Sequence, residues 1–226
     1  MILWERKTIF VHIYKTAGTS ISSRLKQSSP GHRLQSASHR FAQMAGVLPV
    51  ISANFAAKIG SSRPQLWKHA GIKEYKIFLG DRFPEFFSFA FVRNPYSWQV
   101  SIYEYIRSSP GHPLHSFCKS VSFCEYLRSG VPESVRPQAD FISSTDYKCS
   151  VDFVGKYESI NEHWPLVASR VGCDPSPLSR LNVAASRRPL LFYYDKEAVK
   201  IVSSRFAVDM DMFGYSSSFD DAASDS

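Results

Sequence analysis

Two polar clusters that could bind an anion each follow an apolar run with the composition of a strand. Residues 9–13 are mostly β-branched or aromatic and predict a buried strand, and residues 15–20 then read Lys-Thr-Ala-Gly-Thr-Ser. A helix that starts here, with Thr19 or Ser20 as its cap, would leave its first backbone N–H groups without a partner inside the helix. These groups, the Lys15 ammonium and three hydroxyls would form a phosphate site.

The second cluster begins at Arg93. Residues 89–92 are Phe-Ala-Phe-Val and predict a second buried strand, which Pro95 ends because proline cannot donate to a strand ladder. The planar Arg93 guanidinium suits a phosphate, and Ser101 adds a hydroxyl one to two turns into the following helix. Ligands of parallel sheets bind beyond the carboxyl ends of the strands, so we expect Lys15 and Arg93 at one edge.

Both clusters resemble motifs of sulfotransferases that use 3′-phosphoadenosine-5′-phosphosulfate (PAPS), and most of all the carbohydrate sulfotransferases. The donor loop of that family commonly reads H-I-P-K-T-G-G-T-S-I, and residues 12–21 read H-I-Y-K-T-A-G-T-S-I. The family's 3′-phosphate motif is commonly R-N-P-x-D-R-x-x-S-x-Y, and it matches at Arg93, Asn94, Pro95, Ser101 and Tyr103. Ser97 replaces the usual aspartate and Trp98 the usual arginine. Weaker matches to sequence patterns of the same family extend the resemblance over residues 9–215.

The resemblance implies a PAPS-dependent sulfotransferase that needs no metal ion. The 5′-phosphosulfate would lie on Lys15, Thr16, Ala17, Gly18, Thr19 and Ser20, and the 3′-phosphate on Arg93 and Ser101. Lys15 would also stabilise the charge that builds on the leaving phosphate, after which the product is PAP. The acceptor is expected to be a hydroxyl of a carbohydrate or polysaccharide, by resemblance alone.

His69 is the candidate general base of this reaction. Residues 67–70 read Trp-Lys-His-Ala, at the place where bacterial members of the family commonly carry Lys-His-Ala, and a short strand is expected at residues 65–67. Histidine suits proton transfer because its ordinary pKa is about 6.5, and the pH dependence of turnover is expected near that value. For the other six histidines, among them His12 inside the first strand, a solvated or structural role is the simpler interpretation.

The pattern of the chain predicts one α/β domain over residues 1–215. Strands alternate with helices, expected at residues 72–79, 97–107, 117–127, 158–171 and 195–208, which favours a P-loop-like three-layer α/β/α fold with a central, mainly parallel sheet. A third strand is expected at residues 151–157, with Glu158 as a cap of the next helix or as an orienter of a site residue, capping being favoured. Residues 216–226 are rich in Ser and Asp and predict a disordered tail.

Charge and composition limit the partners. The net charge of +7 would attract anionic ligands, but no nucleic-acid motif is present and nucleic acid is not an expected partner. No apolar run reaches the ~20 residues of a membrane helix, so a cytoplasmic or membrane-peripheral location is expected, with the oligomeric state open. The four cysteines have no C-x-x-C spacing and suggest reduced thiols.

Two other functions stay open at this point. An ATP-dependent P-loop kinase is disfavoured because the lysine precedes the glycine in the loop, unlike in the Walker pattern. A catalytically inactive protein that binds PAP, another nucleotide or a glycan is kept open by Ala17, Ser97 and Trp98. The intact Lys15 and His69 favour an active enzyme.

Overall fold

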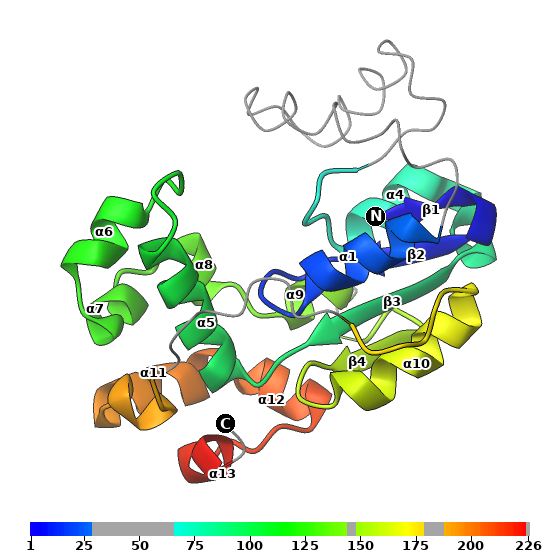
Figure 1. The fold of residues 1–226 in the computed structure, drawn as a ribbon. Coiled ribbons are helices and arrows are strands. Elements are labelled where there is room, and N and C mark those ends of the chain that lie inside the picture. The colour runs from blue at the N-terminus through cyan, green and yellow to red at the C-terminus, as the bar shows by residue number, and fades with distance from the viewer. Residues whose placement is uncertain (29–65, 144–147, 179–187, 225–226) are drawn as a thin grey trace.

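The computed structural model describes residues 1–28, 66–143, 148–178 and 188–224 (Figure 1). Within them, one sheet has the order β1-β2-β3-β4, with strands β1 (Ile2–Leu3), β2 (Thr8–Val11), β3 (Phe87–Val92) and β4 (Phe153–Lys156). β1 runs antiparallel to β2, and the other neighbours are parallel. The predicted α/β class with a mainly parallel sheet is therefore confirmed.

Helices follow the strands in chain order. They are α1 (Gly18–Gln27), α4 (Ile72–Leu79), α5 (Pro95–Arg107), α6 (His115–Ser120), α7 (Phe123–Arg128), α8 (Pro132–Val135), α9 (Ala139–Ile142), α10 (Ile160–Val171), α11 (Lys196–Arg205), α12 (Ala207–Phe213) and α13 (Phe219–Ser224). Short 3-10 helices span Trp4–Arg6, Gly80–Glu85 and Leu190–Phe192. The region predicted as weakly helical at residues 41–59 lies outside the described residues.

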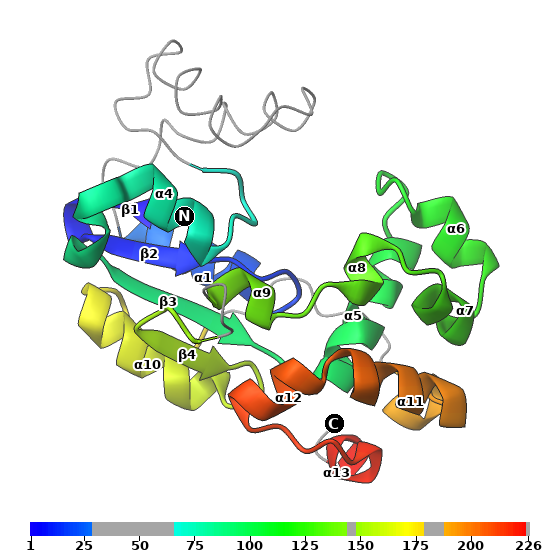
Figure 2. The same cartoon turned by 180° about the vertical axis from the view of Figure 1, so that it is seen from behind.

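The residues of β3 explain why helices cover both faces of the sheet. Every residue of β3 after the first is buried, as expected of a parallel strand with no solvent face. Phe89 and Phe91 pack with α1 and α10, whereas Ala90 and Val92 belong to the core on the other face, with α4, α9 and α12. Figures 1 and 2 show these two sides of the sheet.

A helical lobe, formed by α5, α6, α7 and α11, lies beyond the arrowhead of β3 (Figure 1). Trp98 of α5 joins this lobe to the strand ends. Its ring is fully buried, stacks on Tyr14 at 5.2 Å between centroids and meets Phe206 edge-on at 5.8 Å. Its indole Nε1–H donates to the Tyr14 carbonyl oxygen at 2.8 Å, which satisfies the polar end of the side chain. The lobe therefore packs against the edge of the sheet where β2 and β3 end.

Several local predictions were wrong. Leu66 and Trp67 are not in a strand, and β1, which the sequence did not predict, occupies the edge beside β2. The helix expected at residues 117–127 is two helices, because Ser122 caps α7 in a capping box with Glu125. The helix expected at residues 195–208 ends at Arg205, and α12 then starts after Phe206.

The end of the chain also differs from its predicted disorder. Residues 219–224 form α13, in which Phe219 packs against Tyr96 and Tyr194 at centroid distances of 5.4 and 4.8 Å. Ala222, three residues later, is buried by the same helix face. Two apolar residues at helical spacing are enough to dock this segment on α5, which composition alone did not reveal.

Gly155→Ala should destabilise the fold by about 1–3 kcal/mol, the usual cost of overpacking a core. A Cβ at Gly155 would lie 2.4 Å from the Phe91 ring, so the central strand or the ring must move. Gly111→Ala is the matched control, because a Cβ there meets nothing within 4 Å. Urea unfolding of both variants measures the difference, and equal stabilities would contradict the tight packing of β4 on Phe91.

Candidate functional site

The turn between β2 and α1 presents the start of a helix to one edge of the sheet. Lys15 and Ala17 both have left-handed backbone conformations, with φ of 63° and 64°. This compact turn lets α1 begin at Gly18 with Ala17 as its N-cap, and no described side chain bonds to cap it. The prediction that Thr19 or Ser20 caps the helix was therefore wrong. The first N–H groups of α1 are arranged to bind an anion.

Two contacts fix the shape of this turn. A Cβ at Gly18 would lie 1.9 Å from Nε2 of His12, so only glycine allows the imidazole to pack here. His12 is itself buried and stacks on Phe10 at a centroid distance of 5.4 Å. The Thr16 hydroxyl donates to the Ile13 carbonyl oxygen at 2.9 Å and ties the turn to the end of the strand. Thr16 thus has a structural bond in addition to its predicted ligand role.

Arg93 lies where β3 ends and reaches the same turn. Its Nη1 is 3.5 Å from the Lys15 carbonyl oxygen, its Nε donates to the Ser97 hydroxyl at 2.9 Å, and its guanidinium lies 4.5 Å from the centre of the Tyr157 ring. Ser101 follows Ser97 by one turn of α5 and lies on the same side of that helix. The structure therefore brings together the two predicted phosphate motifs.

Lys15 points its ammonium at the ring of Tyr105, with Nζ 4.5 Å from the ring centre. Tyr105 belongs to α5 and is 47% exposed, so the pair lies at the surface of the site. A cation over an exposed aromatic face is stabilised by roughly 0.5–1 kcal/mol, so this contact alone would oppose an anionic ligand only weakly.

His69 is brought to this edge by the segment that precedes α4. Its Nδ1 lies 2.8 Å from the His12 carbonyl oxygen, and its ring lies 4.8 Å from that of His12 and 5.8 Å from that of Tyr14. A carbonyl oxygen can only accept, so Nδ1 carries the proton and Nε2 keeps its lone pair. That tautomer is the one that a general base requires.

Burial changes the acidity of His69 from the sequence-based expectation. The pKa falls to about 4, mainly because the ring is buried; the bond to the His12 carbonyl opposes this fall, and the neighbouring Lys68 cation adds to it. The pKa of His12 is also lowered well below its usual value, first by burial and then by His69 and Lys68. Both imidazoles are therefore neutral at pH 7, and the pKa of His69 lies below the ordinary histidine value on which the expected pH dependence was based.

Two residues that contact Arg93 or its neighbour Asn94 were missed or misjudged from the sequence, namely Tyr157 and Glu158. Glu158 does not cap α10, whose N-cap is Ser159. Instead its Oε1 accepts the backbone N–H of Asn94 at 2.8 Å, and its Oε2 accepts the Tyr215 hydroxyl at 2.9 Å. Glu158 therefore orients residues next to Arg93, which was the less favoured of its two predicted roles. Tyr157, beneath Arg93, was missed although an aromatic residue directly after a strand is a visible signal.

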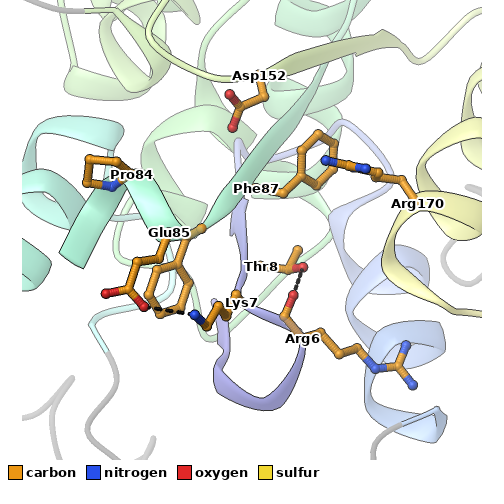
Figure 3. Close-up of a pocket in the computed structure, with 9 residues that line it drawn as sticks. Arg6, Lys7, Thr8, Pro84, Glu85, Phe87, Asp152 and Arg170 are labelled. Carbon is orange, nitrogen blue, oxygen red and sulfur yellow. Dashed lines mark hydrogen bonds and ion pairs between the residues drawn. The ribbon is translucent and has the colours of Figure 1, made fainter.

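A concave region lies at the opposite end of β2 and β3 (Figure 3). It encloses about 430 Å³ around Thr8 and Phe87, which are the first residues of β2 and β3. Its charged groups are bonded to the protein: Lys7 pairs with Glu85 at 3.0 Å, and the Asp152 carboxylate accepts the N–H and hydroxyl of Ser88 at 2.7 Å. Since the carboxyl ends of the strands carry the matched motifs, we place the candidate site there.

Among the described residues, no group of three or more His, Cys, Asp or Glu side chains is placed to hold a metal ion. The helices of the same residues include none with the length and apolar character to cross a bilayer. All four cysteines are free thiols, as predicted.

Comparisons with protein-family models, with curated proteins and with solved structures found no match.

We expect acid to destabilise the fold partly through His69. Its pKa is about 6.5 in the unfolded chain and about 4 in the fold, so between these values the unfolded chain binds more protons. Stability should fall as the pH drops from 6.5 towards 4, by at most about 1.4 kcal/mol per pH unit for this group. Above 6.5 the group is neutral in both states and contributes no slope.

The measurement is urea unfolding of wild type and His69→Asn at pH 7 and pH 5. The asparagine amide can keep the bond to the His12 carbonyl but does not titrate, so this variant should lose less stability on acidification. His115→Asn is the control, because His115 also bonds a carbonyl oxygen, that of Ile106 at 3.1 Å. Identical acid sensitivity of wild type and His69→Asn would contradict a buried neutral His69.

Proposed function

We propose that this protein is a PAPS-dependent sulfotransferase with a P-loop-like three-layer α/β/α fold, acting on a carbohydrate hydroxyl. The observation that carries the proposal is the approach of Arg93 Nη1 to the Lys15 carbonyl oxygen, at 3.5 Å. It joins two sequence motifs that are 78 residues apart, and each follows one of two adjacent parallel strands. A nucleotide with phosphates at both its 5′ and 3′ positions would need two anion sites that lie close together, as these two motifs do.

The donor would be bound by charge and by backbone donors. The 5′-phosphosulfate would lie at the N-terminus of α1, where the N–H groups of the first turn and the helix dipole favour an anion. The 3′-phosphate would lie against the Arg93 guanidinium and the Ser101 hydroxyl on α5. In this arrangement Ser97 supports Arg93 with a hydroxyl, where the resembled family uses a carboxylate.

The chemical step would be an in-line transfer. As the acceptor oxygen forms its bond to sulfur, Nε2 of His69 takes the hydroxyl proton, and the bond between sulfur and the bridging phosphate oxygen breaks. The electron pair goes to PAP, whose new charge the Lys15 ammonium and the α1 N–H groups stabilise. Preorganised donors of this kind commonly contribute about 3–4 kcal/mol each to lowering a barrier. In this mechanism His69 receives the proton of the acceptor hydroxyl, and Lys15 stabilises the negative charge that forms on PAP.

Arg93→Ala should weaken PAP binding by about 1.5–3 kcal/mol, the range for a hydrogen bond to a charged group. Adenosine 5′-phosphosulfate, which lacks the 3′-phosphate, should lose much less. Isothermal calorimetry with both ligands measures the two losses. Arg93→Lys, which keeps the charge but not the fork, should give a smaller loss of the same kind.

Arg128→Ala is the control for removal of an arginine, because Arg128 pairs with Glu197 on the surface of the helical lobe. Equal losses for the two ligands would rule out the 3′-phosphate role of Arg93. Binding of ATP in preference to PAP by wild type would favour the kinase alternative instead.

His69→Ala and His69→Asn should lower kcat by about 10²–10⁴, the usual contribution of a positioned acid–base group, with little change in PAP affinity. Lys15→Ala should lose both turnover and donor binding. Because burial lowers the pKa of His69 to about 4, kcat/KM of wild type should be flat from pH 8 down to about 5 and fall only below that. PAPS turnover on a permissive oligosaccharide, with PAP binding run in parallel, tests all three variants.

Retention of most of the kcat by His69→Asn would remove His69 from the mechanism. PAP binding without any turnover by wild type would support the inactive binding protein.

A further inference from the structure

The backbone of Arg93 is held by a side chain rather than by a strand. Just beyond the last residue of β3, the Arg93 N–H donates to Oε1 of Gln138 at 2.8 Å, and Nε2 of Gln138 donates to the Arg93 carbonyl oxygen at 2.7 Å. Gln138 is fully buried and Arg93 is 5% exposed, so water does not replace these bonds. One carboxamide thus satisfies both polar backbone groups of the residue that points at the ligand.

Gln138 is itself fixed from behind by Asp209 of α12. The two carboxylate oxygens of Asp209 accept the backbone N–H of Gln138 at 2.9 Å and that of Ala139 at 2.8 Å. Asp209 is fully buried, which raises the pKa of its carboxyl to about 6, and the two N–H bonds at the start of α9 oppose that rise because they favour the charged form. The chain of contacts runs from α12 through Gln138 to Arg93 and spans residues that are 71 and 45 positions apart.

We propose that Gln138 and Asp209 are positioning residues that set the preference of the donor site for a 3′-phosphorylated nucleotide. The inference rests on the proposed function, since it acts through the assigned role of Arg93. An arginine can hold a phosphate with its planar fork only if its backbone is fixed to a fraction of an ångström. The contacts of the guanidinium with Ser97 and Tyr157 set the direction of the Arg93 side chain. The Gln138 carboxamide fixes the Arg93 backbone from which that side chain extends.

The positioning role predicts a specific kinetic pattern. Contacts to the 3′-phosphate, which is remote from the sulfur, act equally on ground and transition states, so their loss raises KM and leaves kcat unchanged. Damage that loosens the whole site would instead lower kcat, because His69 and the Lys15 turn would move as well. The split between KM and kcat therefore separates positioning of Arg93 from general loss of structure.

The experiment compares wild type with Gln138→Met, which keeps the length of the side chain but removes both hydrogen bonds. We expect the KM for PAPS and the Kd for PAP to rise about tenfold or more, with kcat within about twofold and a much smaller change for adenosine 5′-phosphosulfate. Gln99→Met is the matched control, because Gln99 is also a fully buried glutamine but bonds the Glu133 carbonyl oxygen in α8 and the Tyr126 hydroxyl in α7. This variant should bind PAP as wild type does.

Asp209→Asn tests whether Asp209 acts on Arg93 through Gln138. It should act in the same direction as Gln138→Met, and the double variant should be no worse in PAP binding than Gln138→Met alone, because Asp209 acts through Gln138. Additive losses would overturn this part of the proposal.

Separate outcomes distinguish the inference from the proposed function. If wild type binds PAP no better than adenosine 5′-phosphosulfate, both the function and the positioning role fail. If wild type prefers PAP and Gln138→Met retains that preference, only the positioning role fails. The same holds if Gln138→Met loses both ligands equally or lowers kcat as much as it raises KM. Loss of hydrogen-exchange protection at the Arg93 amide in Gln138→Met, with β3 still protected, would show that the variant folds and has lost this bond.

Discussion

The parallel pairing of β2 with β3 is the constraint on which the candidate site depends. The register places Val11, the last residue of β2, opposite Ala90, two residues before β3 ends at Val92. The chain that leaves β2 therefore meets the chain that leaves β3, and the contact of Arg93 with the Lys15 carbonyl follows from that register. A shift of one residue would turn each strand's side chains to the opposite face and expose or overfill both cores. The packing that stabilises the fold also sets the spacing between the two candidate anion sites.

Electrostatics at this edge are dominated by burial and by cations. The His69 imidazole is neutral because it is buried, and the charged groups that act on it include Lys68 and Arg136. A donor that carries several negative charges would reverse this field and raise the pKa of His69 in the complex. In the proposed mechanism, the resting site would keep the candidate base His69 deprotonated, and donor binding would make it a stronger base before the transfer. Such an order would suit a sulfotransferase that binds its nucleotide before its acceptor.

The sequence predicted the parts of the site whose signals are local. A strand followed by Lys-Thr-Ala-Gly-Thr-Ser, and another followed by Arg-Asn-Pro, placed Lys15 and Arg93 at one edge, where the structure has them. The start of α1 was misplaced because Ala17 adopts a left-handed conformation, which an alanine seldom does and which no residue pattern indicates. Gln138 and Asp209 were not recognised because a bond between a side chain and a distant backbone leaves no periodicity in the sequence. The pKa of His69 was misjudged for a related reason: its burial is created by residues far away in the chain.

Trp98 bears on how this chain could change over evolutionary time. It stands where the resembled family carries an arginine, yet here it is a core residue stacked on Tyr14 and bonded to its carbonyl oxygen. An arginine here would place a cation at a fully buried position, where water could not solvate it. Accepting that arginine would require changes at Tyr14 and Phe206, the packing partners of Trp98. The charge at this position therefore cannot be changed alone: a single substitution of Trp98 would also disturb the packing that joins the helical lobe to the strand ends.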